Sequence, residues 1–269
     1  MSTVTISSVP PAPSIPATQL KPKEHGAYAI LAIPILTALV ACGPSVASVC
    51  IAVASITGFL AHEPLLVAIG HRGARAQRTS PAATKRLALL LAITVAGGSA
   101  ALLLGDMKVR VALAACAAMA VVSFSVAIAG KHRTMVGQLL GVIGLSIPCL
   151  PMLLAGGTGI PISLEAWGTW LIGFLSTTIA VRSVIASQKR QSRLFHISTL
   201  AFLTLSVLLA TVVGKLELPI VTTPMLAMSW YLLWSPPPAK YLKRVGWTLV
   251  AGTVATAVWM AIAVSSSFS

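Results

Sequence analysis

The chain of 269 residues contains no Asn and few acidic side chains. Its acidic residues are Glu24, Glu63, Asp106, Glu165 and Glu217. Oxygen-rich cages for calcium or magnesium need several carboxylates in one place, and this chain has five for its whole length. Charged residues make up 9% of the chain, against about 25% in an average soluble domain. The composition therefore excludes an ordinary soluble protein and disfavours carboxylate metal cages.

Closely spaced cysteines are absent as well. The four cysteines are single residues within apolar runs, at positions 42, 50, 116 and 149. None has the Cys-X-X-Cys spacing that is typical of zinc and redox sites. We therefore expect no thiolate metal centre and no disulfide framework, and we interpret these cysteines as small residues of a membrane core.

The N-terminal segment lacks the features of a cleaved signal peptide. Its first charged residue is Lys21, and four prolines with many Ser and Thr come before it. No basic region precedes an apolar run there. The sequence predicts a disordered cytoplasmic tail over residues 1–23 and one transmembrane helical domain over residues 24–269.

Long apolar runs fill the rest of the chain, which is 57% hydrophobic. A helix needs about 20 apolar residues to span a bilayer, with roughly 17 as the lower limit. The sequence predicts an all-α polytopic membrane protein with nine transmembrane helices. We place them at about 26–42, 45–67, 87–105, 109–130, 135–155, 166–187, 194–214, 218–234 and 246–265.

The positive charges alternate between the predicted loops. Fifteen of the nineteen Lys and Arg residues fall in every second loop or in the tail, and three fall in the other loops. Loops rich in Lys and Arg stay cytoplasmic, so we predict a cytoplasmic N-terminus and an external C-terminus. The net charge of +14 is spread in small clusters, so we expect membrane lipids as partners and no nucleic acid.

Polar side chains gather near the predicted cytoplasmic ends of three helices. They lie at the entry of the first helix, at the exit of the second helix and its loop, and near the end of the sixth helix. A charged residue inside a span costs about 2.5 to 3.5 kcal/mol on insertion scales, so we expect Glu63 and Arg182 to pair. The candidate ligand-binding residues are Glu24, His25, His62, Glu63, Arg72, Arg75 and Arg182.

The same residues also have plainer explanations, which the sequence leaves open. An acid before a helix, such as Glu24, is stabilised by the helix dipole. Arg182 could extend its long side chain to the headgroups. The basic run from Arg72 to Arg86 could set the topology and contact lipid.

The same end of the predicted bundle contains side chains of the types that bind metals. His25, His62, Glu24 and Glu63 have the donor types of a two-histidine, one-carboxylate site. Adjacent residues of a helix point about 100° apart, so His62 and Glu63 cannot easily hold one ion. We expect no metal and no cofactor.

The residues also resemble a known family. The entry Pro-Lys-Glu-His-Gly-Ala-Tyr at 22–28, Pro34, the basic loop after the second helix and Val-Arg-Ser at 181–183 look like the YwiC-like family of bacterial integral membrane proteins. The resemblance extends from Lys21 to about Val264. It implies a location in the bacterial cytoplasmic membrane, and it brings no known reaction with it.

The layout is distantly similar to the UbiA prenyltransferase superfamily, whose fold has two four-helix repeats and a ninth helix. The aspartate-rich magnesium motifs of that superfamily are missing here. The matching zones read His-Glu-Pro-Leu-Leu at 62–66 and Val-Arg-Ser-Val-Ile at 181–185. The resemblance therefore implies a UbiA-like bundle without magnesium-dependent prenyl transfer.

Two functions stay open at this point. The first is binding or transport of a small anionic or amphiphilic ligand through a cytoplasm-facing cavity. The second is a metal-independent, UbiA-like membrane transferase that acts on an isoprenoid or lipid, with Glu63 or Glu24 as general base. Because no nucleophile motif is present, we favour a protein that is not an enzyme.

Overall fold

The computed structural model describes residues 25–73, 77, 81–131, 134–238 and 242–266. The predicted tail, with Glu24, and Arg75 lie outside these residues. All regular secondary structure of the described residues is helical. The elements are α1 (His25–Cys42), α2 (Val46–Ala68), α4 (Pro81–Leu104), α5 (Met107–Ile128), α6 (Met135–Ser146), α7 (Cys149–Ala155), α8 (Ile160–Gln188), α9 (Leu194–Val212), η2 (Leu218–Thr222), α10 (Thr223–Trp234) and α11 (Leu242–Ser266).

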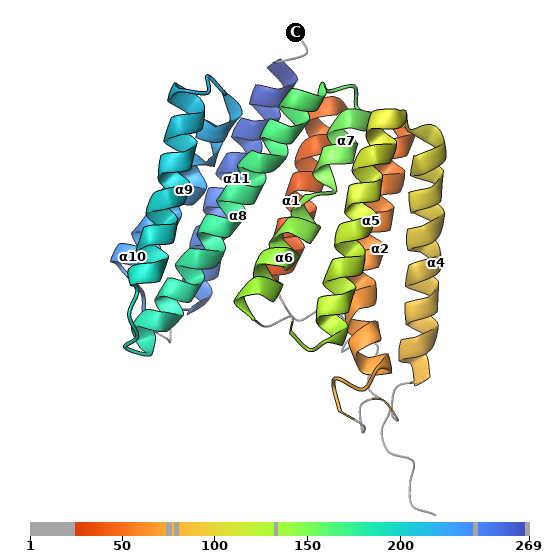
Figure 1. Cartoon of the computed structure of the whole chain (residues 1–269), viewed down its shortest axis with the longest axis horizontal. Coiled ribbons are helices and arrows are strands. Elements are labelled where there is room, and N and C mark those ends of the chain that lie inside the picture. Colours follow the sequence, from red (N-terminus) through yellow and green to blue (C-terminus); the bar gives the residue numbers. More distant parts are fainter. Residues whose placement is uncertain (1–24, 74–76, 78–80, 132–133, 239–241, 267–269) are drawn as a thin grey trace, which may run out of the picture.

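The helices stand side by side in one bundle (Figure 1). The segment from α1 to α7 forms one part of it, in which α2 packs extensively on α4. The segment from α8 to α11 forms the other part, in which α8 and α11 both pack on α10. Contacts of α1 with α11 and of α7 with α8 join the two parts.

Seven helices of the described chain are long and apolar enough to cross a membrane. Two further apolar helices are shorter, Gly26–Cys42 and Leu218–Trp234. Every predicted segment coincides with helix, so the all-helical membrane class is confirmed. Three helices begin four to six residues before the predicted starts, at Pro81, Ile160 and Leu242. The reason is that hydropathy marks the apolar layer, whereas a helix continues through polar residues beyond it.

Prolines divide the fifth predicted segment into two helices. Proline has no N–H and its ring clashes with the preceding turn, so it breaks a helix interior. Pro148 stands between α6 and α7, and Pro151 lies within α7. The predicted segment 135–155 is therefore two helices in series, with the break at residues 147–148.

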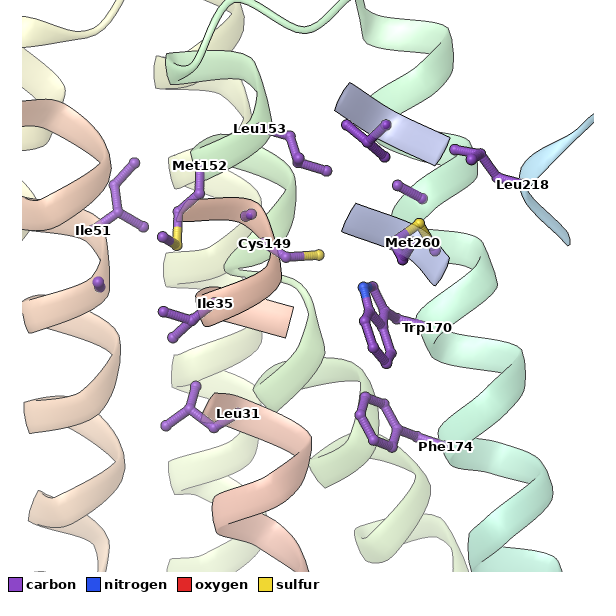
Figure 2. Close-up of a cluster of buried hydrophobic side chains, with 14 of the residues drawn as sticks. Leu31, Ile35, Ile51, Cys149, Met152, Leu153, Trp170, Phe174, Leu218 and Met260 are labelled. Atoms are coloured by element: carbon purple, nitrogen blue, oxygen red, sulfur yellow. The ribbon is translucent and has the colours of Figure 1, made fainter. Parts of the chain in front are cut away.

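The core of the bundle is a cluster of apolar side chains from both parts (Figure 2). Leu31 and Ile35 of α1 face this cluster, and α8 contributes Trp170 and Phe174, whose rings stack 5.5 Å apart. Cys149 is buried in it as a free thiol. Large apolar residues cover the outside; Leu103, for example, is 80% exposed. Such a surface suits lipid, since soluble monomers rarely expose large apolar patches.

The C-terminal ends of α2, α5 and α8 lie at the same end of the bundle, the lower end in Figure 1. The residues at or just after these helix ends include Arg72, Lys131 and Lys189. We call this the basic end. The last turn of α11 lies at the opposite end (Figure 1).

Candidate functional site

Two polar clusters lie near the basic end. The first, the Glu63 pair, is formed by Glu63 of α2 and Arg72 of the turn that follows. Glu63 is 3% exposed and the Arg72 side chain is 27% exposed. Arg72 Nε donates to Glu63 Oε1 at 2.8 Å, and Arg72 Nη2 donates to Oε2 at 2.6 Å. Both carboxylate oxygens are therefore held by one guanidinium in a bidentate pair.

The turn after α2 explains how Arg72 reaches back to the helix. Gly70 has a φ of +80°, a left-handed conformation that costs glycine nothing. The amide of His71 then donates to the carbonyl of Leu66 at 2.9 Å. The chain reverses at this point, and Arg72 returns to the carboxylate nine residues before it.

Side chains of α1 and α4 lie near the Glu63 pair. Tyr28 of α1 interacts electrostatically with Arg86 of α4 and with Glu63. Its ring meets the ring of Phe59 edge-on, with centroids 4.9 Å apart. The ring contact joins α1 to α2 beside the pair, and the buried carboxylate of Glu63 already has an internal counter-charge in Arg72.

The second cluster lines a cleft of about 540 Å³, which we call the Arg182 cleft. It is formed by α6, the C-terminal part of α8, the turn after α8 and the start of α9. Its lining residues are Gln138, Thr178, Val181, Arg182, Ile185, Ala186, Lys189, Gln191 and His196. Arg182 Nε donates to Gln138 Oε1 at 2.9 Å, which links α8 to α6 and orients the guanidinium.

The Arg182 cleft carries excess positive charge. Arg182 and Lys189 line it, and no acidic side chain occurs among its described lining residues. His196 interacts electrostatically with Arg182 and with Arg193, and its Nδ1 is buried without a hydrogen-bond partner. Arg193 Nη1 donates to the carbonyl of Leu233 at 2.7 Å. The cleft therefore offers cations and a histidine with no carboxylate beside them.

The predicted pairing of Glu63 with Arg182 is wrong. Glu63 pairs with Arg72, and Arg182 bonds to Gln138. The turn after α2 brings a guanidinium onto the carboxylate from nine residues away, so Glu63 needs no partner from α8. Arg182, which is only half-buried, is satisfied at Nε by a neutral amide.

The two candidate histidines lie on different helices. His62 lies on α2, with its ring centroid 6.4 Å from that of Phe124. His25 begins α1. The described residues contain no group of three His, Cys, Asp or Glu side chains that could hold a metal ion.

The candidate residues predicted from the sequence left out five polar residues of the cleft, namely Gln138, Thr178, Lys189, Gln191 and His196. One available signal was Gln138, a polar residue within an apolar segment that needs a hydrogen-bond partner. Its partner on α8, 44 residues further along the chain, depends on helix packing, and no sequence spacing reveals it.

The fold and these clusters define a polytopic α-helical membrane protein with two polar clusters near one end. The model of the YwiC-like protein family matches residues 22–152, which confirms the resemblance to that family over these residues. The part of the bundle from α1 into α7 is therefore similar to YwiC-like proteins. The matched region contains the Glu63 pair and ends within α7, so Arg182 and most of its cleft lie beyond it. No curated protein and no solved structure matches the chain.

Proposed function

We propose that this protein binds a small anionic or amphiphilic ligand in the Arg182 cleft, as a binding or transport protein. The observation that carries the proposal is the charge of the cleft: Arg182 and Lys189 line about 540 Å³ of space with no acidic residue in the described lining. Positive groups close to an apolar layer are costly unless an anion compensates them. A ligand could supply that anion.

The geometry of Arg182 supports an anion with several oxygens. A guanidinium presents five N–H donors in a fixed plane, which suits the oxygens of a phosphate or carboxylate. Gln138 takes the donor on Nε and so fixes the plane. The terminal nitrogens carry the donors that an anion would accept, and Gln191 and His196 line the same cleft.

We further propose nine transmembrane spans in the bacterial cytoplasmic membrane, arranged as two four-helix repeats and a ninth helix. The two short apolar helices each have 17 residues, about 25 Å of helix rise, against a hydrocarbon layer of about 30 Å. The clustering of Lys and Arg at the basic end supports a cytoplasmic orientation of that end. The cleft then opens toward the cytoplasm, and the C-terminus lies outside.

The transferase alternative has less support. A general base must reach the proton that it removes. The carboxylate of Glu63 is occupied by Arg72, and the described lining of the cleft contains no other carboxylate. Membrane lipids remain the expected surroundings of the bundle.

The test is binding of dodecyl phosphate, below its micelle concentration, to the full chain in nanodiscs of zwitterionic lipid. Arg182→Ala should weaken binding at least tenfold, or about 1.4 kcal/mol. Arg182→Lys should give an intermediate loss, because lysine keeps the charge and loses the planar fork. Binding should survive EDTA, because the anion is held by N–H donors.

The matched control is Arg110→Ala, which removes an exposed arginine from the first turn of α5. This turn lies at the opposite end of the bundle (Figure 1). It should leave the affinity unchanged. Unchanged affinity in Arg182→Ala, or loss of binding in EDTA, would show that the proposed anion site is wrong.

A further inference from the structure

The Arg182 cleft continues into a line of half-exposed residues on α8. In the middle of α8 most positions are buried, among them Trp170, Phe174, Thr177 and Ile179. Between residues 167 and 182 the half-exposed positions come singly or in neighbouring pairs, every three or four residues, as expected for one face of a helix. We call one row of these positions, continued to the more exposed Ile185, the α8 stripe: Gly168, Leu171, Leu175, Thr178, Arg182 and Ile185. Trp167, Ile172 and Val181 are half-exposed beside this row.

The stripe and the cleft share residues, so they form one continuous surface. Thr178, Arg182 and Ile185 belong to both. From Arg182 to Gly168 the helix rises about 21 Å, which takes the stripe from the basic end into the apolar layer. The surface therefore changes along its length from a cationic cleft to an apolar strip.

Neighbouring helices bound this surface on both sides. Gln138 of α6 and His196 of α9 line the cleft together with α8, and Figure 1 shows α6 and α9 on opposite sides of α8. At the far end of the stripe, a Cβ added to Gly168 would meet nothing within 4 Å. The stripe is thus open at Gly168, whereas Leu171 and Leu175 are half-exposed and also pack in part against the core cluster. It lies on the helix that is otherwise the most buried of the candidate spans.

We infer that the ligand of the Arg182 cleft is a membrane-resident amphiphile with an anionic phosphate head, whose hydrocarbon tail lies along the α8 stripe. This inference rests on the proposed anion site and specifies its substrate class. The cations of the cleft complement the head, and the narrow apolar stripe suits a single tail. Such a ligand would enter sideways from the lipid layer.

The experiment uses hexadecyl phosphate with a photoreactive diazirine near the end of its tail, added to the full chain in zwitterionic nanodiscs. Mass spectrometry after illumination should find labels on α8 around Leu171 and Leu175. Excess dodecyl phosphate should reduce this labelling at least fivefold, whereas dodecylphosphocholine, which has a zwitterionic head, should leave it. Labels spread evenly over α4 and α5, unaffected by either competitor, would show ordinary lipid contact and overturn the inference.

A pair of glycine variants supplies the matched control. Gly168→Trp fills the far end of the stripe and should lower labelling of Leu171 at least threefold. Gly98→Trp on α4, where an added Cβ also meets nothing within 4 Å, should leave it unchanged. Equal labelling in the two variants would contradict the tail placement.

A tail-less probe separates failure of the inference from failure of the proposed function. Inorganic phosphate should bind the wild type and Gly168→Trp equally, and Arg182→Ala should lose it. If Arg182→Ala abolishes phosphate binding while labelling ignores the stripe, the anion site stands and the lipid assignment is wrong. If Arg182→Ala changes neither probe, both are wrong.

Discussion

The Glu63 pair and the Arg182 cleft lie near the same end of the bundle, but their charged side chains have different kinds of partner. Glu63 is almost fully buried and bonds through both oxygens to Arg72. Arg182 is half-buried and bonds through Nε to the neutral amide of Gln138. The charges of Glu63 and Arg72 compensate each other, whereas the Arg182 cleft keeps its positive charge.

Burial explains this difference. A carboxylate removed from water needs a counter-charge within the protein, because its desolvation costs several kcal/mol. A long arginine beside an open cleft can reach water, headgroups or a ligand. We therefore interpret the Glu63 pair as a stabilising contact and the Arg182 cleft as the site of binding.

The largest effect on stability should come from Arg72→Gln. It leaves the carboxylate of Glu63, 3% exposed, without its cation, which should cost about 3 to 5 kcal/mol. The measurement is the free energy of unfolding in mixed micelles, with Lys108→Gln as an exposed control expected to stay within about 0.5 kcal/mol of the wild type. A loss no larger than that of the control would mean that the pair contributes nothing.

Glu63→Gln should cost less than Arg72→Gln. The remaining arginine is 27% exposed and can turn toward water or headgroups, so we expect a loss of roughly 1.5 to 3 kcal/mol, the range for a hydrogen bond to a charged group. The same unfolding measurement applies. A larger loss for Glu63→Gln than for Arg72→Gln would show that the buried carboxylate is not the costly partner.

The smallest effect should come from Arg182→Gln. Its stability change should stay within about 0.5 kcal/mol, as for ordinary surface substitutions, although anion binding is lost. Combined with Glu63→Gln, the two changes should add to within about 0.5 kcal/mol, as independent sites do. A coupling above 1 kcal/mol would mean that Glu63 and Arg182 interact after all.

Much of the fold could be predicted from hydropathy and loop chemistry. Each of the nine apolar runs coincides with helix in the described part of the chain, because a span must satisfy its backbone within itself and carry apolar side chains. The break between α6 and α7 was harder to foresee, because prolines are tolerated in membrane helices. The family resemblance was visible in the entry at residues 22–28, and the family match covers that region.

The candidate site was predicted only in part. Arg182 was identified as a lone charge near an apolar zone, and it lines the cleft. Its companions were not, because Gln138 and His196 come from helices that precede and follow α8, and no local pattern indicates which of their faces meet α8. Arg72 was named as a ligand residue, but its bond to Glu63 depends on the turn at Gly70.

The sequence by itself determined the class of the protein, the helices and the clustering of positive charge, because each of these follows from local composition and periodicity. Only the tertiary structure decided which charges meet. The partner of a charge depends on where the helices pack and on the direction that each turn gives the chain. Arg72 and Arg182 carry the same charge, and their positions in the fold decide which of them meets Glu63. The chain reversal at Gly70 assigned Arg72 to Glu63 and left Arg182 with the cleft.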